Sequence, residues 1–351
     1  MSTVFAVELA WWQATAVKLA VVSLLVPAAA LILGYVFLLK MMSHMQSRLG
    51  PMEAGPHGTL QLVADGIKFI QKEDLFPNNA DRFVFKIAPI VVLVSTFLLW
   101  VVLPAGPDLV VEQLDPGIFY ALAVSSLSVI GVLMAGWASA NKYSLLGGLR
   151  AAGQLIAYEL PMVLAVFGVV IQAETLDLQG IVSAQATQEI FGFGGLGNPF
   201  ILTQAVGFLI FLAAVQAELT QPPFDMPVAE SEIVGGYQVE YTGFRFLFFF
   251  MGEFATAFVF AGIASVLFLG GWSLPPFLMD LLGIDQGSNI MNLVGPAVLF
   301  LKIMFVSFLI FWVRFTYPRF REDQLQAFAW KVLIPLSLAN IVVTGVMKVL
   351  L

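Results

Sequence analysis

Six carboxylates lie close together in the sequence around a single base, Arg245. They fall in and around the segment AELTQPPFDMPVAESEIVGGYQVEYTGFRF, which joins two long apolar runs. A carboxylate is costly in or near hydrocarbon, so acids placed there require bases, water or a bound proton as partners. This pattern is typical of a site that carries protons or binds cations. The six acids are Glu218, Asp225, Glu230, Glu232, Glu240 and Glu253.

The composition of the chain predicts a membrane protein. Hydrophobic residues make up 60% and charged residues 11%, whereas a soluble domain has roughly 25% charged residues. Cysteine is absent and only two histidines occur, His44 and His57. We therefore expect no disulfide, no metal site and no cluster held by this chain, and no catalytic residue of the usual kinds. The 23 acids against 16 bases argue against a nucleic-acid partner.

The apolar runs indicate the architecture. Crossing about 30 Å of hydrocarbon takes around 20 apolar residues. Between the first two runs, residues 58–72 carry Leu60, Val63, Ile67 and Ile70 at spacings of three and four, as an amphipathic helix at the membrane interface does. We predict an all-α polytopic membrane protein with a single membrane domain, 1–351. Its eight spans are placed near 16–42, 85–103, 118–139, 153–173, 199–219, 244–270, 294–314 and 330–350.

The distribution of bases predicts the orientation. Most of the 16 Lys and Arg lie in or beside the loops that join spans one to two, three to four, five to six and seven to eight. The positive-inside rule puts these loops in the cytoplasm and both termini outside it. The acidic loop, residues 218–243, is then cytoplasmic.

Four loop sequences point together to one family. They are MQSRLGPMEAGPHGTLQLVADGIKFIQKED, GWASANKYSLLGGLRAAGQLIAYELP, PPFDMPVAESEIVGGYQVEYTGFRF and VRFTYPRFREDQLQAFAWKVLIPL. They occur in this order along the chain, and the match extends from about residue 16 to residue 350. With these loops the chain resembles the H subunit of proton-pumping NADH:quinone oxidoreductase, respiratory complex I. Related hydrogenase subunits share the PFD…AE pattern, but the R-x-GP loop and EYTGFRF favour the quinone branch.

The resemblance implies a role within an enzyme complex. Such a subunit anchors the redox arm in a bacterial-type inner membrane, walls part of the quinone chamber and begins a chain of buried carboxylates. It binds no cofactor alone, and quinone is the substrate of the complex. The implied partners are the cluster-bearing and quinone-site subunits of the hydrophilic arm, the neighbouring membrane subunits and the lipid bilayer.

The family motifs assign candidate residues to the quinone chamber. Arg48 matches the basic residue of the R-x-GP loop, and Phe224 and Asp225 match PFD. Glu230 and Glu232 follow in the same loop. The alternative role for Arg48 is a cytoplasmic anchor that reaches lipid headgroups.

A second set of residues is assigned to proton coupling. Burial raises the pKa of a carboxyl group toward working pH, so an acid within a span is able to act as a relay. The alternative is a neutral group that only makes structural hydrogen bonds. Arg150 is either a counter-ion for this set or an ordinary anchor. The set comprises Glu159, Glu218, Glu240, Glu253 and Arg150.

The chain departs from the family pattern at four positions. Leu38 and Leu39 stand where the family has Glu-Arg before Lys40. In the acidic loop the family's arginine is Gln221, and one of its glutamates is Val228. These changes leave the exact proton path open.

Two other functions remain open from the sequence alone. One is the equivalent subunit of a membrane-bound hydrogenase or of a complex with another electron donor. The other is an autonomous cation transporter, against which stands the absence of a detectable inverted repeat.

Overall fold

The computed structural model describes residues 11–187, 197–283 and 288–350, and their regular elements are all helical. Among these residues, seven helical stretches are long and apolar enough to cross a membrane. An eighth apolar helix, α10, is shorter, with 14 residues, Ala205–Glu218. The predicted fold class is confirmed. The first three stretches are Trp11–Met45 (α1, Trp11–Leu33; η1, Gly34–Met41; α2, Met42–Met45), Arg82–Val102 (α4, Arg82–Leu99; η3, Trp100–Val102) and Gly117–Ala138 (α5, Gly117–Ser125; α6, Leu127–Ala138). The other four are α7 (Lys142–Ala173), α12 (Gly243–Phe268), Ile290–Thr316 (in α14, Asn289–Thr316) and Glu322–Leu350 (α15, Glu322–Phe328; η6, Ala329–Leu333; α16, Ile334–Leu350).

The helix α7 begins well before the predicted span at residue 153. Asn141 caps its first turn, because the side-chain oxygen accepts a hydrogen bond from the Tyr143 amide at 2.9 Å. A Cβ atom on Gly147 would collide with the backbone of Gly236, so this glycine allows the acidic loop to pack against the helix. Arg150, predicted at the mouth of the span, consequently lies within the helix.

The fifth predicted span, 199–219, is divided in the structure. A short helix, α9 (Phe200–Thr203), precedes α10, and Gln204 between them is not helical. The Gln204 side chain instead bonds to the last helix, α16 (Ile334–Leu350): its amide donates to Thr344 Oγ1 at 2.6 Å and accepts from Asn340 Nδ2 at 2.8 Å. These bonds attach a helix that otherwise buries few residues.

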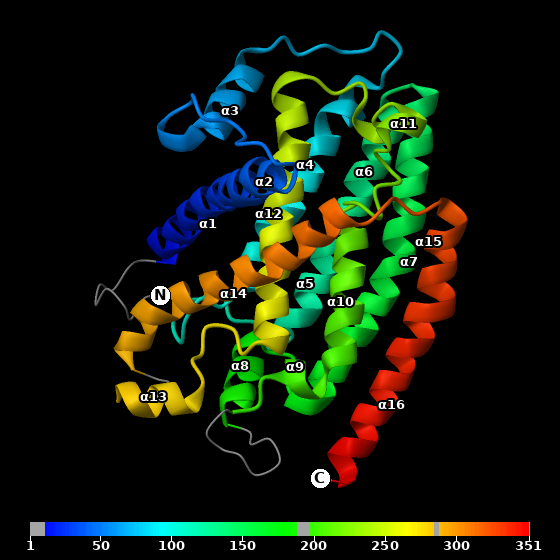
Figure 1. The fold of residues 1–351 in the computed structure, drawn as a ribbon. Helices are drawn as coiled ribbons and strands as arrows, with labels where there is room; N and C mark the ends of the chain where they lie inside the picture. Colours follow the sequence, from blue (N-terminus) through cyan, green and yellow to red (C-terminus); the bar gives the residue numbers. More distant parts are fainter. Residues whose placement is uncertain (1–10, 188–196, 284–287, 351) are drawn as a thin grey trace.

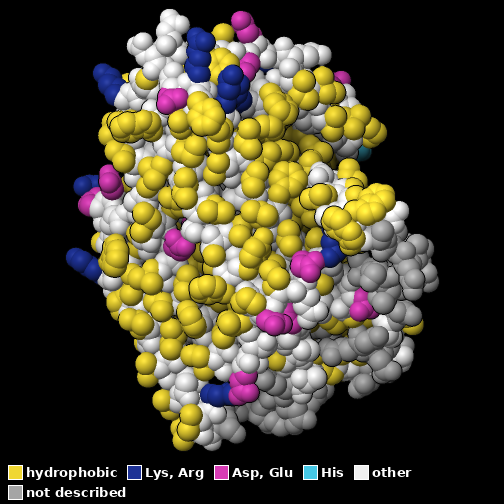
Figure 2. Space-filling model, turned by 180° about the vertical axis from the view of Figure 1, so that it is seen from behind, with side chains coloured by type: hydrophobic (Ala, Val, Ile, Leu, Met, Phe, Trp, Pro, Cys, Tyr) yellow, Lys and Arg dark blue, Asp and Glu magenta, His cyan; other side chains and the backbone are white. Residues whose placement is uncertain are grey.

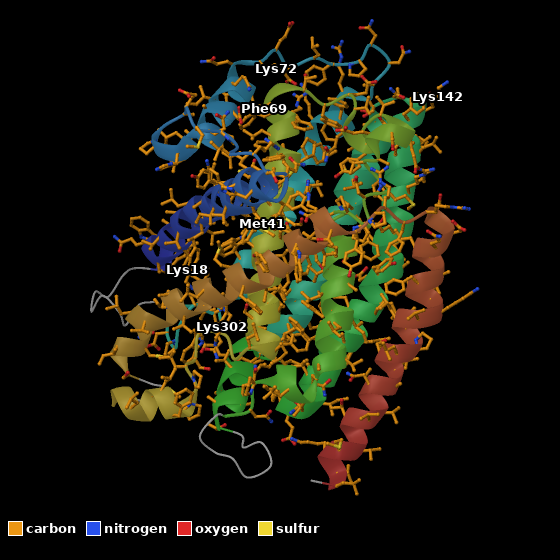
Figure 3. All side chains as sticks on the ribbon, in the orientation of Figure 1. Lys18, Met41, Phe69, Lys72, Lys142 and Lys302 are labelled. Atoms are coloured by element: carbon orange, nitrogen blue, oxygen red, sulfur yellow. The ribbon has the colours of Figure 1, made fainter. Side chains whose placement is uncertain are left out.

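The helices form a tilted bundle with α12 at its centre. In Figure 1, α7, α10, α12 and α16 run roughly upright, whereas α1 and α14 cross them obliquely. Nearly all residues of α12 from Phe254 to Phe268 are buried. The two short helices α3 (Gln61–Gln71) and α11 (Glu230–Ile233) lie at the same end of the bundle, and the chain ends at the opposite end. Lys72 and Lys142, labelled in Figure 3, mark the end that carries α3 and α11.

The outer surface suits a lipid environment. Hydrophobic side chains cover most of the face seen in Figure 2, and several Lys and Arg side chains gather along its upper edge. On α3, Val63, Ile67 and Ile70 are exposed, whereas Phe69 packs on Phe246 of α12 with ring centroids 5.5 Å apart. This helix therefore attaches to the bundle by one face and leaves its apolar stripe free.

Candidate functional site

The acidic loop is held by ion pairs to distant parts of the chain. Asp225 Oδ2 accepts a hydrogen bond at 2.9 Å from Arg319, which follows α14, and the same guanidinium donates to Ser231 Oγ at 3.0 Å. One arginine thus ties the beginning of the loop to α11. Both side chains of the pair are largely buried.

A second pair fixes the other side of α11. Arg150 Nη1 of α7 contacts Glu232 Oε2 at 2.8 Å, and its Nε lies 3.8 Å from Glu322 at the start of α15 (Glu322–Phe328). Arg150 therefore has the position of a counter-ion for two acids. Glu230, the first residue of α11, is exposed and lies close enough to Asp225 to affect it electrostatically.

The next acid along this line is Glu253, near the middle of the molecule. It sits on α12, and its Oε1 lies 3.5 Å from Arg314 Nη1 and accepts a hydrogen bond from Gln221 Nε2 at 3.3 Å. Arg314 is in the last turn of α14 and acts electrostatically on Asp225 as well. The Asp225 and Glu253 carboxylates thus share one guanidinium between them.

A cavity connects Glu253 with Glu218. Its volume is about 60 Å³, room for about two water molecules at roughly 30 Å³ each. Hydroxyl groups line it, including those of Thr96 and Thr256, which bond to each other at 2.8 Å. Glu218 Oε2 is buried and has no hydrogen-bond partner among the described residues. A water molecule in the cavity would satisfy this oxygen.

Glu159 continues the line beyond the cavity. It lies half-buried on α7, and α10, which carries Glu218, packs against that helix. The two carboxylates are close enough to repel each other. The structure therefore places Asp225, Glu253, Glu218 and Glu159 in a series.

Asp225 and Tyr237, both outside the spans, have shifted pKa values. Burial raises the pKa of Asp225, and the nearby Arg319 and Arg314 partly oppose that rise. Burial also raises the pKa of Tyr237, which lines the cavity, and the Glu253 and Asp225 carboxylates act in the same direction. Asp225 is thereby closer to exchanging a proton than an ordinary surface aspartate is.

Three further predicted residues are not members of this series. Arg48 is exposed, and the hydrogen bond that the structure gives it is local, from Nε to Gln46 Oε1 at 2.7 Å. Glu240 faces a surface pocket and accepts from Asn141 Nδ2 at 2.6 Å. The ring of Phe224 is buried and packs on Tyr158 and Phe320, so within this chain it supports the loop from beneath.

The sequence match decides the family. The sequence model described as NADH dehydrogenase matches residues 17–345. The chain belongs to the NADH dehydrogenase family. It is 44% identical over 311 residues to the H subunit of the NADH-quinone oxidoreductase of Anoxybacillus flavithermus, covering 88% of this chain and 86% of that protein. The H subunit numbered 2 of the NADH-quinone oxidoreductase of Syntrophobacter fumaroxidans is 43% identical over 347 residues, 95% of this chain and 97% of that protein. The resemblance seen in the four loops is confirmed.

Several residues that contact the acid series or line its cavity are not predicted from the sequence. Arg314 and Arg319 stand in the family motif VRFTYPRF, which indicates the family but does not show that its two arginines pair with Glu253 and Asp225. Gln221 departs from the family pattern, and the structure shows that it bonds to Glu253. The motif and that departure were the available signals. No sequence signal marked Thr96 and Thr256, because single threonines in apolar spans are common.

Proposed function

We propose that this chain is the H-type membrane subunit of an NADH-quinone oxidoreductase. In this proposal it anchors the redox arm, walls part of the quinone chamber and transmits the protonation state of that chamber into the membrane. The support is the family membership together with the acid series, which begins in the loop and ends inside the bundle.

The quinone end is assigned to the loop and its neighbours. Asp225, Glu230 and Glu232 have bases or solvent beside them and lie at the end of the bundle that carries α3. Arg48 belongs to this end by its motif, and the hydrophilic subunits dock there. The quinone head lies close to Asp225, and Phe224 positions that carboxylate.

The coupling step is electrostatic. Reduction of quinone to quinol takes up two electrons from a partner subunit and two protons, so the charge near Asp225 changes during the reaction. That change alters the preference of Asp225 and Glu253 for a proton through their shared Arg314. Water in the cavity carries the proton between Glu253 and Glu218, and Glu159 is the next acceptor. Arg150 and Glu240 help to hold the loop in place.

The orientation of the chain in the membrane follows from the assignment of the quinone end to the acidic loop. The loop end faces the cytoplasm of a bacterial-type cell, where electrons arrive, and both termini lie outside it. The opposite end of the bundle faces the outer side of the membrane.

The experiment that tests this function is purification of the assembled complex through a tag on this chain, followed by identification of its subunits and assay of quinone reduction. Inhibitor-sensitive quinone reduction with iron–sulfur subunits present is the expected result. Hydrogen evolution without quinone reduction, or cation flux through the chain alone in liposomes, contradicts the proposal.

A further inference from the structure

An apolar groove lies between α1 and α14, away from the acid series. Its volume is about 300 Å³, and hydrophobic side chains form nearly all of its lining. The loop residues 109–111 close one side of it. These loop residues and the first half of α14 belong to the end of the bundle opposite α3. Residues that define the groove are Leu25, Ala28 and Ile32 of α1, Phe258 of α12, and Leu299 and Phe300 of α14.

An ion pair stands beside the mouth of this groove. Lys18 lies on the same face of α1 as Leu25, Ala28 and Ile32, because the spacings follow the helical repeat. Its Nζ contacts Glu112 Oε2, and the two side chains are 32% and 54% exposed. Figure 3 labels Lys18 on α1. One positive and one negative group are therefore both accessible there.

The start of α1 indicates the depth of this ion pair in the membrane. Trp11 and Trp12 are 81% and 57% exposed, and exposed tryptophans favour the boundary between membrane and water. Lys18 follows Trp12 by six residues, about 9 Å along the helix at 1.5 Å per residue. A lysine at that depth extends its ammonium group to the headgroup region.

We propose that the groove binds one acyl chain of a zwitterionic phospholipid, with the phosphate beside Lys18 and the headgroup ammonium beside Glu112. The walls of an apolar groove offer water no hydrogen-bond partners. A hydrocarbon chain in the groove makes van der Waals contacts with those walls instead. From Lys18 to Ile32 the helix rises about 21 Å, which suits an extended chain running inward from a headgroup. The paired charges match a zwitterion, and a quinone carries no charge that would match them.

Lipid retention by the assembled complex tests this site. The complex is incubated with phosphatidylethanolamine vesicles, washed in mild detergent, and its bound lipid is counted by mass spectrometry. Ala28→Phe fills the groove and is expected to reduce retained phosphatidylethanolamine about fivefold, a loss near 1 kcal/mol. Ala20→Phe is the matched control, because Ala20 is exposed on α1 outside the groove and its substitution leaves retention unchanged.

A second variant addresses the headgroup and covers the case in which Ala28→Phe fails to assemble. Lys18→Gln leaves the groove intact and removes the partner of the phosphate, so phosphatidylethanolamine retention falls. Equal retention in wild type and both variants overturns the proposal, as does wild-type preference for phosphatidylglycerol or for quinone at this site. Lipid counting does not depend on turnover, so a failure here is distinct from a failure of the proposed function.

Discussion

Gln221 donates a hydrogen bond to Glu253 across 3.3 Å, on the same oxygen that Arg314 approaches to 3.5 Å. The family pattern that the four loops resemble is expected to have an arginine at position 221. In this chain a neutral amide contacts the carboxylate instead, and Arg314 is the base that contacts it among the described residues. The Glu253 carboxylate is therefore held by one guanidinium and one neutral amide.

This arrangement predicts that the two positions compensate for each other. Arg314→Gln leaves Glu253 without its base and is expected to lower quinone reduction by the assembled complex about tenfold, because a hydrogen bond to a charged group contributes about 1.5–3 kcal/mol. Adding Gln221→Arg in the same chain restores a base and recovers most of that loss. The rates of the single and double variants provide the check, and a double variant as slow as Arg314→Gln contradicts the pairing.

The Asp225–Arg319 pair predicts a shift in pH dependence. Arg319 lowers the pKa of Asp225 against the larger effect of burial, so Arg319→Gln raises that pKa. If ionised Asp225 is required, activity is lost as pH falls through its pKa, and the variant loses it at higher pH than wild type. The pH profile of quinone reduction measures this.

Arg321→Gln is the control for the pH profile, because Arg321 is exposed and pairs locally with Asp323. An unchanged acid limb in Arg319→Gln counts against the role of Asp225.

The cavity predicts an effect of single hydroxyl groups. Thr256→Val keeps the shape of the side chain but removes the bond to Thr96 and a polar group from the cavity wall. Water is then held less well, and proton pumping is expected to fall several-fold while the complex assembles normally. Thr316→Val serves as the control, since Thr316 bonds to its own helix at an exposed site. Equal pumping in the two variants would count against a hydrated connection.

The Gln204 cluster predicts a loss of stability without a loss of chemistry. Gln204→Leu removes the bonds to Thr344 and Asn340, each worth about 0.6 kcal/mol in a membrane and at most about 1.7. The complex should inactivate at a lower temperature, with its initial rate unchanged. Leu338→Ala, at an exposed position on α16, should change the inactivation temperature less. A variant with wild-type heat stability would show that the cluster does not hold α16.

Much of the fold is predictable from the sequence, because the lipid bilayer permits few kinds of spanning structure. Hydrocarbon requires long apolar helices, so spans such as the one around Glu253 are visible as runs of hydrophobic residues. The true start of α7 at Lys142 is not visible in this way, because Lys142, Ser144 and Arg150 interrupt the apolar run there and these turns pack on the acidic loop. The start of α7 depends on tertiary contacts that hydropathy does not contain, whereas its end at Ala173 agrees with the predicted span.

The candidate site is only partly predictable. Burying an acid within a span is costly, so a single acid there indicates a functional site. Glu159, Glu218 and Glu253 are predicted on this basis. Their partners are not local: Asp225 and Arg319 are separated by 94 residues, and only the folded chain brings them together. The placement of Arg48 at the quinone end rests on its motif and remains a prediction.

The central claim is that Glu218 passes protons from the loop end into the bundle, and Glu218→Gln tests it most directly. The assembled variant is compared with wild type in proteoliposomes by measuring quinone reduction and proton translocation together. Glu174→Gln is the matched control, because Glu174 is exposed at the far end of α7 and pairs with Lys348. Our account predicts that Glu218→Gln assembles but loses most of its coupled turnover, about tenfold or more as for a lost proton-transfer group, while the control behaves as wild type. Full quinone reduction with full proton translocation in Glu218→Gln would contradict it.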